Sequence, residues 1–344
     1  MIYFDTTKSG AATHRSGLTR VSRRLRQELG AAAVPVAWPA PHDARTVARL
    51  SATDWYFTAE LFSAAERTGF DDFLAARPLR TAALFHDAIP LKLPHITWPQ
   101  SVARHPGYLK RLAAFDRVFA VSRASKDELE GFWRWQGLRV TPPVDVLALG
   151  ADFAAATERA GIAPPPGRPQ LLAVGILEPR KNQGFLLDVC ERLWADGLDF
   201  ELHLIGRENP HFGGPIVAAL RQLRRAGRPV QWHGAADDAT LQERYAQARA
   251  TVFPTIAEGC GLPLLESLQL GVPCVCSDLP VLRENADGGG CVPVPVNEAD
   301  AWCAALRRLL TDDAWVAALR VQAKARVLPA WADTAKALRA ALGV

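Results

Sequence analysis

A glycine-rich loop with a glutamate at each end is the segment of this sequence best suited to chemistry. The letters EGCGLPLLE run from Glu258 to Glu266 and follow an apolar run, TVFPT, with the character of a strand. Pro263 suits the first turn of a helix and Gly271 the position just past its end, so we expect a helix over about 262–270. Backbone N–H groups at such a helix start, together with the helix dipole, attract a diphosphate. The pattern therefore predicts an anion site flanked by two carboxylates.

A cationic loop in the same half of the chain supplies the charge that such a site needs. The apolar run LLAVG ends at Gly175, and Arg180 and Lys181 follow within the letters ILEPRKN. Ligands of open parallel sheets bind beyond the carboxyl ends of the strands, which is where this loop falls. Arg can hold phosphate oxygens with two hydrogen bonds and Lys acts as a point charge, so the pair would stabilise a leaving diphosphate. An isolated Arg-Lys pair is more often surface charge, but the glutamate-flanked loop favours a shared site.

Short apolar runs alternate with helical patterns along the whole chain, which indicates repeated β-α units and two mostly parallel sheets. In the first half we expect strands at 2–5, 34–37, 55–58, 81–85, 117–121 and 144–147. In the second half we expect them at 170–174, 200–205, 230–232, 250–253, 273–276 and 290–292. The prolines concentrated in residues 163–169 can form neither a helix nor a central strand, so we place a linker at about 150–169.

The first expected helix carries a cluster of arginines. Leu18, Val21, Leu25 and Leu29 recur at helical spacing and should face the sheet. The arginines should point elsewhere, and they are Arg15, Arg20, Arg23, Arg24 and Arg26. An anionic acceptor or a membrane surface could bind this cluster, and a solvated helix face explains it equally well. Gly17 either lets the loop approach a ligand closely or only makes a tight turn.

The composition is that of an ordinary globular protein, with 344 residues, of which 49% are hydrophobic and 22% charged, and a net charge of +4. This charge does not imply nucleic acid binding. Six cysteines, all in the second half, form no C-x-x-C pair, so we expect reduced core thiols and no zinc site. The opening letters MIYFD resemble a strand rather than a signal peptide, and no apolar run is long enough to span a bilayer. We therefore expect a cytoplasmic protein, with peripheral association at the inner face of the membrane left open.

We assign no function to two tryptophans and two histidines of the first half. Trp133 and Trp135 alternate with polar residues, and we expect them to pack against their own domain rather than to touch a lipid. We interpret His95 and His105 as ordinary loop residues.

Several of these motifs together resemble a known family. EGCGLPLLE with the upstream LEPRKN is similar to the signature of the large family 4 of retaining glycosyltransferases (glycosyltransferase group 1), in its mannosyltransferase-like subgroup. Further segments of that subgroup resemble RSGLTRV at 15–21, HDAIP at 86–90, VSRASKD at 121–127 and WHG at 232–234. The resemblance spans almost the whole chain, and it implies an α/β protein of GT-B fold. Two Rossmann-like, doubly wound domains would face each other across a central cleft.

The resemblance also assigns roles to the parts of the chain. Residues 1–155 would form an acceptor-binding domain and residues 165–325 a nucleotide-sugar-binding domain. The segment 326–344 would form a C-terminal helix that packs back on the first domain.

The catalytic residues that the resemblance implies are His86, Arg180, Lys181 and Glu258. The two cations would stabilise the diphosphate, and Glu258 would hold hydroxyls of the sugar. His86 follows an expected strand directly, and we favour contact with the transferred sugar over a structural hydrogen bond. Donor contacts would also come from Glu266 on the ribose and from Gly175, Gly234, Gly259, Cys260, Gly261 and Leu262. Acceptor contacts would come from Gly17, Leu18 and Arg20.

The reaction that the resemblance implies is transfer of a sugar from a nucleotide diphosphate, with retention at the anomeric carbon. GDP-mannose is the favoured donor, a glycan or lipid-linked molecule the acceptor, and polysaccharide biosynthesis the setting. We find no convincing enzymic nucleophile, and we expect neither a metal nor a cofactor besides the donor, because Arg, Lys and the helix start already supply positive charge. Two alternatives stay open: an epimerase or hydrolase of nucleotide sugars on the same fold, and a non-catalytic nucleotide-binding subunit.

Overall fold

The computed structural model of the chain describes residues 1–11, 17–38, 51–153 and 166–344. It divides into two compact units, one of Met1–Gly150 with Pro329–Val344 and one of Ala151–Leu328, which we call the first and the second unit. Most of the expected linker lies outside the described residues, as do Arg15 and Ser16 at the start of the RSGLTRV motif.

The first unit is built on a six-stranded parallel sheet in the order β2-β1-β3-β4-β5-β6. Its strands are β1 (Ile2–Asp5), β2 (Ala33–Val36), β3 (Trp55–Thr58), β4 (Arg80–Phe85), β5 (Arg117–Ala120) and β6 (Val144–Val146). Every residue of β3 is buried, as is β4 after its first residue, which is expected where helices cover both faces of a parallel sheet.

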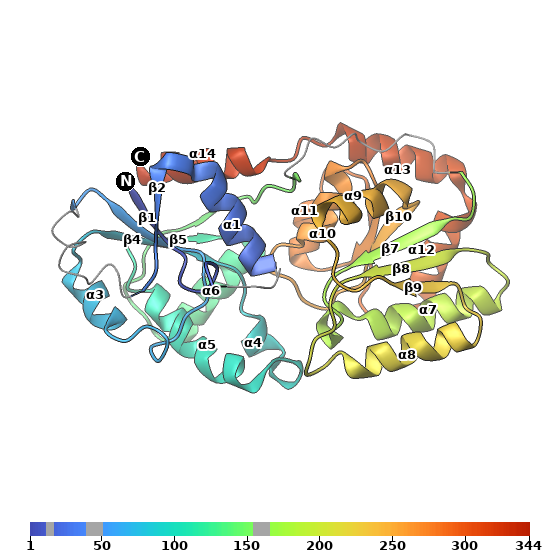
Figure 1. The fold of residues 1–344 in the computed structure, drawn as a ribbon, viewed down its shortest axis with the longest axis horizontal. Helices are drawn as coiled ribbons and strands as arrows, with labels where there is room; N and C mark the ends of the chain where they lie inside the picture. The colour runs from blue at the N-terminus through green and yellow to red at the C-terminus, as the bar shows by residue number, and fades with distance from the viewer. Residues whose placement is uncertain (12–16, 39–50, 154–165) are drawn as a thin grey trace. The chain divides into compact units, whose positions relative to one another are not determined.

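Helices lie on both faces of this sheet (Figure 1). They are α1 (Gly17–Leu29), α3 (Phe70–Ala76), α4 (Ile89–Lys92), α5 (Pro99–Leu112) and α6 (Arg123–Trp135), with 3₁₀ turns at Gly30–Ala32 and Pro94–Ile96. The core on one face joins side chains of α3, α5 and α6, among them Phe73, Leu109 and Phe132. The hydroxyl of Ser122 caps α6 by accepting the N–H of Ser125 at 3.0 Å, which gives the VSRASKD letters a local structural role.

The C-terminal helix α14 (Trp331–Leu342) belongs to the first unit and packs beside α1 (Figure 1). The indole Nε1 of Trp55 donates to the carbonyl of Leu342 at 2.8 Å, and the hydroxyl of Thr334 donates to the carbonyl of Ala148 at 2.9 Å. Leu338 is fully buried. The first unit is therefore assembled from two segments that are far apart in the sequence.

The second unit repeats the pattern with a six-stranded parallel sheet in the order β12-β11-β10-β7-β8-β9. Its strands are β7 (Gln170–Val174), β8 (Glu201–Ile205), β9 (Val230–Trp232), β10 (Ala250–Phe253), β11 (Cys274–Ser277) and β12 (Cys291–Val294). The helices are α7 (Gln183–Ala195), α8 (Gly214–Arg225), α9 (Asp238–Gln247), α10 (Leu262–Gln269), α11 (Pro280–Ala286), α12 (Ala299–Thr311) and α13 (Asp313–Ala325), with a 3₁₀ turn at Pro179–Lys181.

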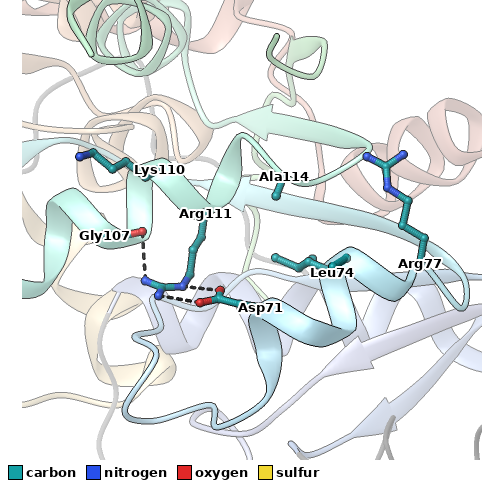
Figure 2. Close-up of a pocket in the computed structure, with 8 residues that line it drawn as sticks. Asp71, Leu74, Arg77, Gly107, Lys110, Arg111 and Ala114 are labelled. Atoms are coloured by element: carbon teal, nitrogen blue, oxygen red, sulfur yellow. Dashed lines mark hydrogen bonds and ion pairs between the residues drawn. The ribbon is translucent and has the colours of Figure 1, made fainter. Parts of the chain in front are cut away.

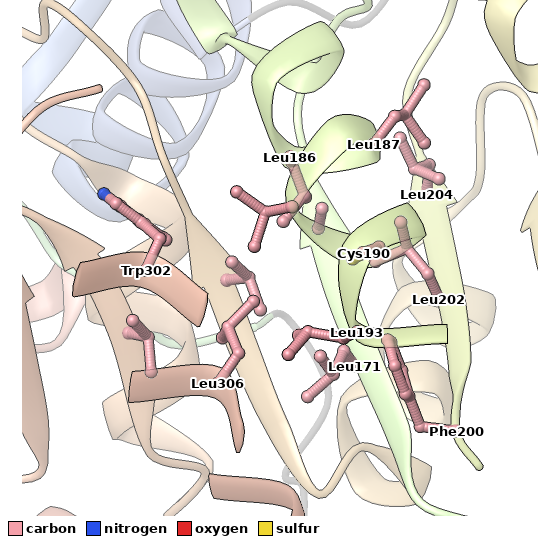
Figure 3. Packing of buried hydrophobic residues seen from close by; sticks show 14 of the residues in the cluster. Leu171, Leu186, Leu187, Cys190, Leu193, Phe200, Leu202, Leu204, Trp302 and Leu306 are labelled. Atoms are coloured by element: carbon pink, nitrogen blue, oxygen red, sulfur yellow. The ribbon is translucent and has the colours of Figure 1, made fainter. Parts of the chain in front are cut away.

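Aliphatic side chains dominate the core of this unit. Figure 3 shows residues of α7, α12 and the strands β7 and β8 pointing toward one another, including Leu186, Leu193, Leu202 and Trp302. A second cluster, with Tyr245 of α9, is built around other side chains of β7 and β8. Both faces of the sheet are thus covered by apolar side chains.

The predicted fold class is confirmed, because each of the twelve expected strands is present in a doubly wound parallel sheet. Two expectations about residues of α5 and α6 are wrong. His105 is a buried residue of α5 rather than a loop residue, and Trp135 at the end of α6 is 78% exposed whereas Trp133 is buried as expected. Within the described part of the chain, the helices are too short or too polar to cross a membrane.

Candidate active site

The loop that follows β7 brings a buried lysine to the carboxyl edge of the second unit's sheet. Gly175 has φ +153°, and a Cβ placed there would lie 3.3 Å from Cε of Lys181, so the glycine leaves room for the lysine stem. Lys181 ends the 3₁₀ turn and is only 9% exposed, with its Nζ 4.8 Å from the centre of the Phe253 ring. The backbone therefore holds the Lys181 ammonium group in a fixed position that is largely shielded from solvent.

Glu258 and the two cations of the EPRKN loop form one ion-pair cluster. The Oε1 atom of Glu258 accepts from Nζ of Lys181 at 2.5 Å and from Nη1 of Arg180 at 2.8 Å. It also accepts from the hydroxyl of Thr255 at 2.9 Å. Arg180 reaches a second carboxylate, with its Nη2 2.7 Å from Oε1 of Glu178. Because β7 and β10 are neighbours in the sheet, the loops that follow them meet.

The charges in this cluster shift each other's protonation. Burial raises the pKa of Glu258, but the charges of Lys181 and Arg180 outweigh burial and hold that pKa below its ordinary value. Burial lowers the pKa of Lys181, and the charge of Glu258 opposes this. The carboxylate is therefore ionised at neutral pH, and two cations and two carboxylates balance within the cluster.

The EGCGLPLLE segment forms a tight loop that leads into α10. Gly261 precedes the helix with φ +80°, and a Cβ there would lie 2.7 Å from Cδ2 of Leu282. The carbonyl of Cys260 accepts from Nδ2 of Asn285 at 2.6 Å. Helix α10 begins at Leu262, so Gly259, Cys260 and Gly261 lie immediately before its N-terminus. This is the arrangement in which backbone N–H groups can bind an anion.

Glu266 lies inside α10 and is 3% exposed. Its Oε2 atom is 3.1 Å from the hydroxyl of Tyr245, which is itself fully buried and also lies 3.2 Å from the carbonyl of Pro263. Glu266 and Glu258 thus have different partners, in line with the different roles expected for them. Tyr245 ends the segment from the WHG letters onward that resembles the family near the nucleotide base, but no role was predicted for it.

Gly234, expected near the nucleotide, follows β9 with φ +67° and accepts the N–H of Gly206 at 2.7 Å. The preceding His233 belongs to a relay that the sequence analysis did not identify. Nε2 of His233 is 3.0 Å from Nδ1 of His203, whose Nε2 is 2.9 Å from a carboxylate oxygen of Glu201.

In the first unit, His86 lies directly after β4 and is buried. Its Nε2 donates to the carbonyl of Ala59 at 2.8 Å, so Nδ1 carries the lone pair. The His86 carbonyl accepts from the hydroxyl of Ser125 at 2.8 Å. Burial lowers the pKa of His86, and the ring is neutral at pH 7. A fixed, neutral imidazole can bind a sugar hydroxyl without bringing a charge.

The residues expected to bind the acceptor lie in the first turn of α1. Gly17 begins the helix, and Arg20 is half-buried. Leu18 is 37% exposed, so the expectation that it faces the sheet is wrong. Arg24 was expected to point away from the protein, but it is buried and pairs with Glu28, 3.4 Å away. The helix is therefore rotated so that Val21, Leu25 and Leu29 alone form its apolar face.

A buried ionic network beside this helix was not predicted. Arg67 contacts the carboxylate of Asp5 and lies 3.4 Å from that of Glu60. Glu60 accepts the backbone N–H groups of Lys8 at 2.8 Å and Ser9 at 2.7 Å. The network thus holds the loop after β1. Asp5 is far in sequence from Glu60 and Arg67, so only the fold reveals that the three residues meet.

An open hollow on the first unit, of about 640 Å³, lies away from these residues. It is formed by α3 and α5 where they lead into the amino ends of β4 and β5, opposite the edge that carries His86. Figure 2 shows Arg111 of this hollow paired with Asp71, at 2.7 and 2.9 Å. Its position at the amino ends of the strands separates it from the edge where doubly wound sheets bind ligands.

The geometry of the second unit agrees with its relationship to known proteins. Residues 168–312 match the model of the family described as "Glycosyl transferases group 1". This stretch contains Arg180, Lys181, Glu258 and Glu266, so the whole cluster lies within the part of the chain that matches this family. The resemblance inferred from EGCGLPLLE and EPRKN is confirmed.

Several curated relatives are mannosyltransferases. The chain is 29% identical over 250 residues to the serotype-specific mannosyltransferase WbdA of Escherichia coli, which covers 69% of this chain and 30% of that protein. It is 36% identical over 148 residues to O-antigen chain mannosyltransferase B of Escherichia coli, covering 42% of this chain and 37% of the relative. The chain therefore spans about a third of the length of these two relatives.

The fold of the whole chain also has solved counterparts. HepE from Anabaena, crystallised with UDP and glucose, matches with a TM-score of 0.73 and 14% identity over 99% of each chain. The two parallel sheets thus have the GT-B fold that the sequence analysis expected. Among the described residues, no group of three or more His, Cys, Asp or Glu side chains is placed to hold a metal ion.

Proposed function

We propose that this chain transfers mannose from a nucleotide diphosphate donor, GDP-mannose above all, to a glycan or lipid-linked acceptor with retention at the anomeric carbon. The observation that carries the proposal is the ion-pair cluster of Lys181, Arg180 and Glu258 at the carboxyl edge of β7 and β10. It places two cations beside the loop that begins α10, where a diphosphate is best stabilised. The mannosyltransferase names of the relatives support the choice of sugar.

Donor binding in this proposal rearranges the cluster. The oxygens of the diphosphate compete with Glu258 for Lys181 and Arg180, because both anions accept hydrogen bonds from the same N–H donors. Glu258 then turns from the cations to the hydroxyls of the sugar. Glu266, held by Tyr245, binds the ribose. Before the donor binds, Glu258 therefore orients Lys181 and Arg180 and neutralises part of their charge. When the donor binds, its diphosphate replaces Glu258 as their anionic partner.

The chemical step uses the donor's own phosphate. The bond between the anomeric carbon and the diphosphate oxygen breaks, and the acceptor oxygen bonds to that carbon on the same face. The acceptor proton passes to an oxygen of the departing diphosphate, whose growing charge Lys181 and Arg180 stabilise. His86 contributes a neutral contact to a sugar hydroxyl. No enzymic nucleophile, metal or further cofactor takes part in this proposal.

A panel of GDP, UDP, dTDP and their sugars, each measured by thermal shift, tests the donor assignment, because a ligand that binds the folded state raises the melting temperature by mass action. GDP and GDP-mannose should give the largest shifts. Release of GDP should then require a glycan or lipid-linked acceptor. Donor breakdown at the same rate without any acceptor would identify an epimerase or hydrolase, and binding without turnover in any acceptor mixture would identify a non-catalytic subunit.

A further inference from the structure

An open cavity of about 610 Å³ lies in the first unit, between α1, the loop after β1 and the edge strand β2. Its size falls within the range of about 300–1,000 Å³ that is usual for small-molecule sites. The lining residues are Thr6, Ser9, Gly10, Ser22, Arg23, Arg26, Gln27, Gly30 and Pro35. Thr6 directly follows β1, so the cavity adjoins the carboxyl end of that strand, the edge at which doubly wound sheets bind ligands.

The packing of α1 directs two arginines to this cavity. Val21, Leu25 and Leu29 are buried on one side of the helix. Arg23 and Arg26 are one turn apart and exposed, and both line the cavity. The arginine cluster of the sequence is thus divided, since Arg24 is buried against Glu28 and takes no part in the lining.

The opposite wall of the cavity is held by hydrogen bonds. Glu60 fixes Ser9 through its backbone N–H at 2.7 Å, and the hydroxyls of Ser22 and Ser9 lie 3.1 Å apart. Nη2 of Arg23 donates to the carbonyl of Ser9 at 3.3 Å, which ties the helix to the loop. The buried network with Arg67 lies behind this wall. The cavity is therefore a supported structure and not a gap between loose side chains.

The charged residues of the described lining are both positive. Two arginines, two serines and a glutamine contribute to the lining, and the described lining contains no acidic residue. Guanidinium forks bind the planar or tetrahedral oxygens of carboxylates and phosphates better than they bind neutral sugars. Arg20, expected to bind the acceptor, precedes Arg23 by one turn of the same helix.

We propose that this cavity binds an anionic group, a phosphate or a carboxylate, carried by the acceptor. That the anion belongs to an acceptor rests on the proposed function, whereas binding of the anion itself does not depend on catalysis. It predicts that acceptors with such a group bind better than their neutral counterparts. Arg23 and Arg26 hold the anion, and Ser9 and Gln27 donate hydrogen bonds to it.

Calorimetric titration of the full chain with glycerol 3-phosphate, glucuronate and neutral glycerol tests the site without any donor. Glycerol 3-phosphate or glucuronate should bind and glycerol should not, and the stronger of the two anions identifies the source as phosphate or carboxylate. The double substitution Arg23→Gln with Arg26→Gln should weaken the anion roughly tenfold or more, as expected for losing charged hydrogen bonds. The pair Arg221→Gln with Arg224→Gln is the control, because these exposed arginines have the same spacing on α8.

The outcomes separate this proposal from the donor site. Both double variants should unfold at the same temperature as the parent chain and bind GDP equally well. Anion binding that is lost only in the Arg23, Arg26 variant supports the cavity, even if GDP-mannose proves not to be the donor. Equal anion binding by that variant and the parent chain, equal loss in the α8 control, or no preference of the parent chain for the anions over glycerol would each overturn it.

Discussion

A single carboxylate oxygen organises the candidate active site. Oε1 of Glu258 accepts from Lys181, Arg180 and Thr255 at once, at 2.5 to 2.9 Å. A buried charge is tolerated when it is paired and hydrogen-bonded, and here each cation depends on the carboxylate as much as the carboxylate depends on the cations. Substitution of one member should therefore affect both the chemistry and the charge balance of its neighbours.

The two glutamates should separate in their kinetics. Glu266→Gln should mainly raise the donor KM, since a ribose contact is similar in the ground and transition states. Glu258→Gln and His86→Ala should mainly lower kcat, because contacts beside the breaking bond tighten as charge develops. Steady-state rates for the three variants check this. If Glu258→Gln mainly raised the donor KM and Glu266→Gln mainly lowered kcat, the roles of the two glutamates would have to be exchanged. An unchanged kcat in His86→Ala would exclude His86 from the mechanism.

The stability of the protein should depend on pH through Glu258. Its pKa in the folded state lies below the ordinary value of 4.5, so the unfolded chain takes up the proton first as the pH falls. The contribution is fully present above about pH 5 and is lost progressively as the pH falls through 4.5 toward the folded pKa. Glu258→Gln should therefore lose less stability than the parent chain between pH 7 and pH 4, as measured by urea unfolding at each pH. Equal losses would show that the carboxylate is not stabilised in the folded state.

At this scale the sequence identifies residues better than it identifies partners. Arg180, Lys181 and Glu258 stand out because charged residues follow predicted strands, but their direct pairing depends on β7 and β10 being neighbours, which is a property of the sheet. The network of Asp5, Glu60 and Arg67 is missed for the same reason. The expectation for Leu18 was wrong for a different reason. An apolar residue at the start of a helix fits the helical period whether or not the sheet covers it, and Leu18 is exposed.

Tight turns between strand and helix position the site at the scale of elements. The EGCGLPLLE loop can turn into α10 because Gly261 has positive φ and lacks a side chain beside Leu282. The strands themselves follow from apolar runs with polar or glycine boundaries, and most predicted bounds agree with the structure within one residue. The largest displacement is at β12, which runs over Cys291–Val294, whereas 290–292 was expected. Gly290 has φ +80°, a conformation outside a regular strand.

Substitution of Gly261 should damage both the fold and the site. Gly261→Ala forces a side chain into positive φ and into Leu282, which should cost about 1–3 kcal/mol of unfolding free energy and weaken GDP binding. Gly184→Ala is the matched control, because Gly184 lies within α7 with open space around its Cα, and alanine there should stabilise by about 0.5–1 kcal/mol. Urea unfolding and GDP titration of both variants measure this. A Gly261→Ala protein as stable as the parent would contradict the account of the turn.

At the scale of the molecule, the first unit depends on a helix from the far end of the chain. The family resemblance implies a helix at 326–344, and α14 contacts Trp55, Ala148 and α1 through buried groups. Which element covers it could not be read from periodicity, because an apolar helix face does not specify its partner. The family resemblance supplied that expectation.

Loosening α14 should affect the two units unequally. Leu338→Ala removes a fully buried side chain and should destabilise the first unit by about 2–5 kcal/mol. Hydrogen exchange should therefore accelerate in α1, α14 and β1 while β7 and β10 keep their protection. Thermal stabilisation by GDP should persist, because its proposed site lies in the second unit. Equal acceleration in both units would contradict their independence.

The central claim is that Lys181 and Arg180 stabilise a departing diphosphate, and the rate of mannose transfer from GDP-mannose in excess EDTA tests it most directly. The parent chain should remain active, and Lys181→Ala and Arg180→Ala should each lower kcat roughly 10²–10³-fold, as expected for loss of a group that stabilises transition-state charge. Arg192→Ala, which removes an exposed arginine paired with Asp300 in the same unit, should leave the rate unchanged. Near-parent rates in both site variants, or activity that vanishes in EDTA and returns with magnesium or manganese, would contradict the account.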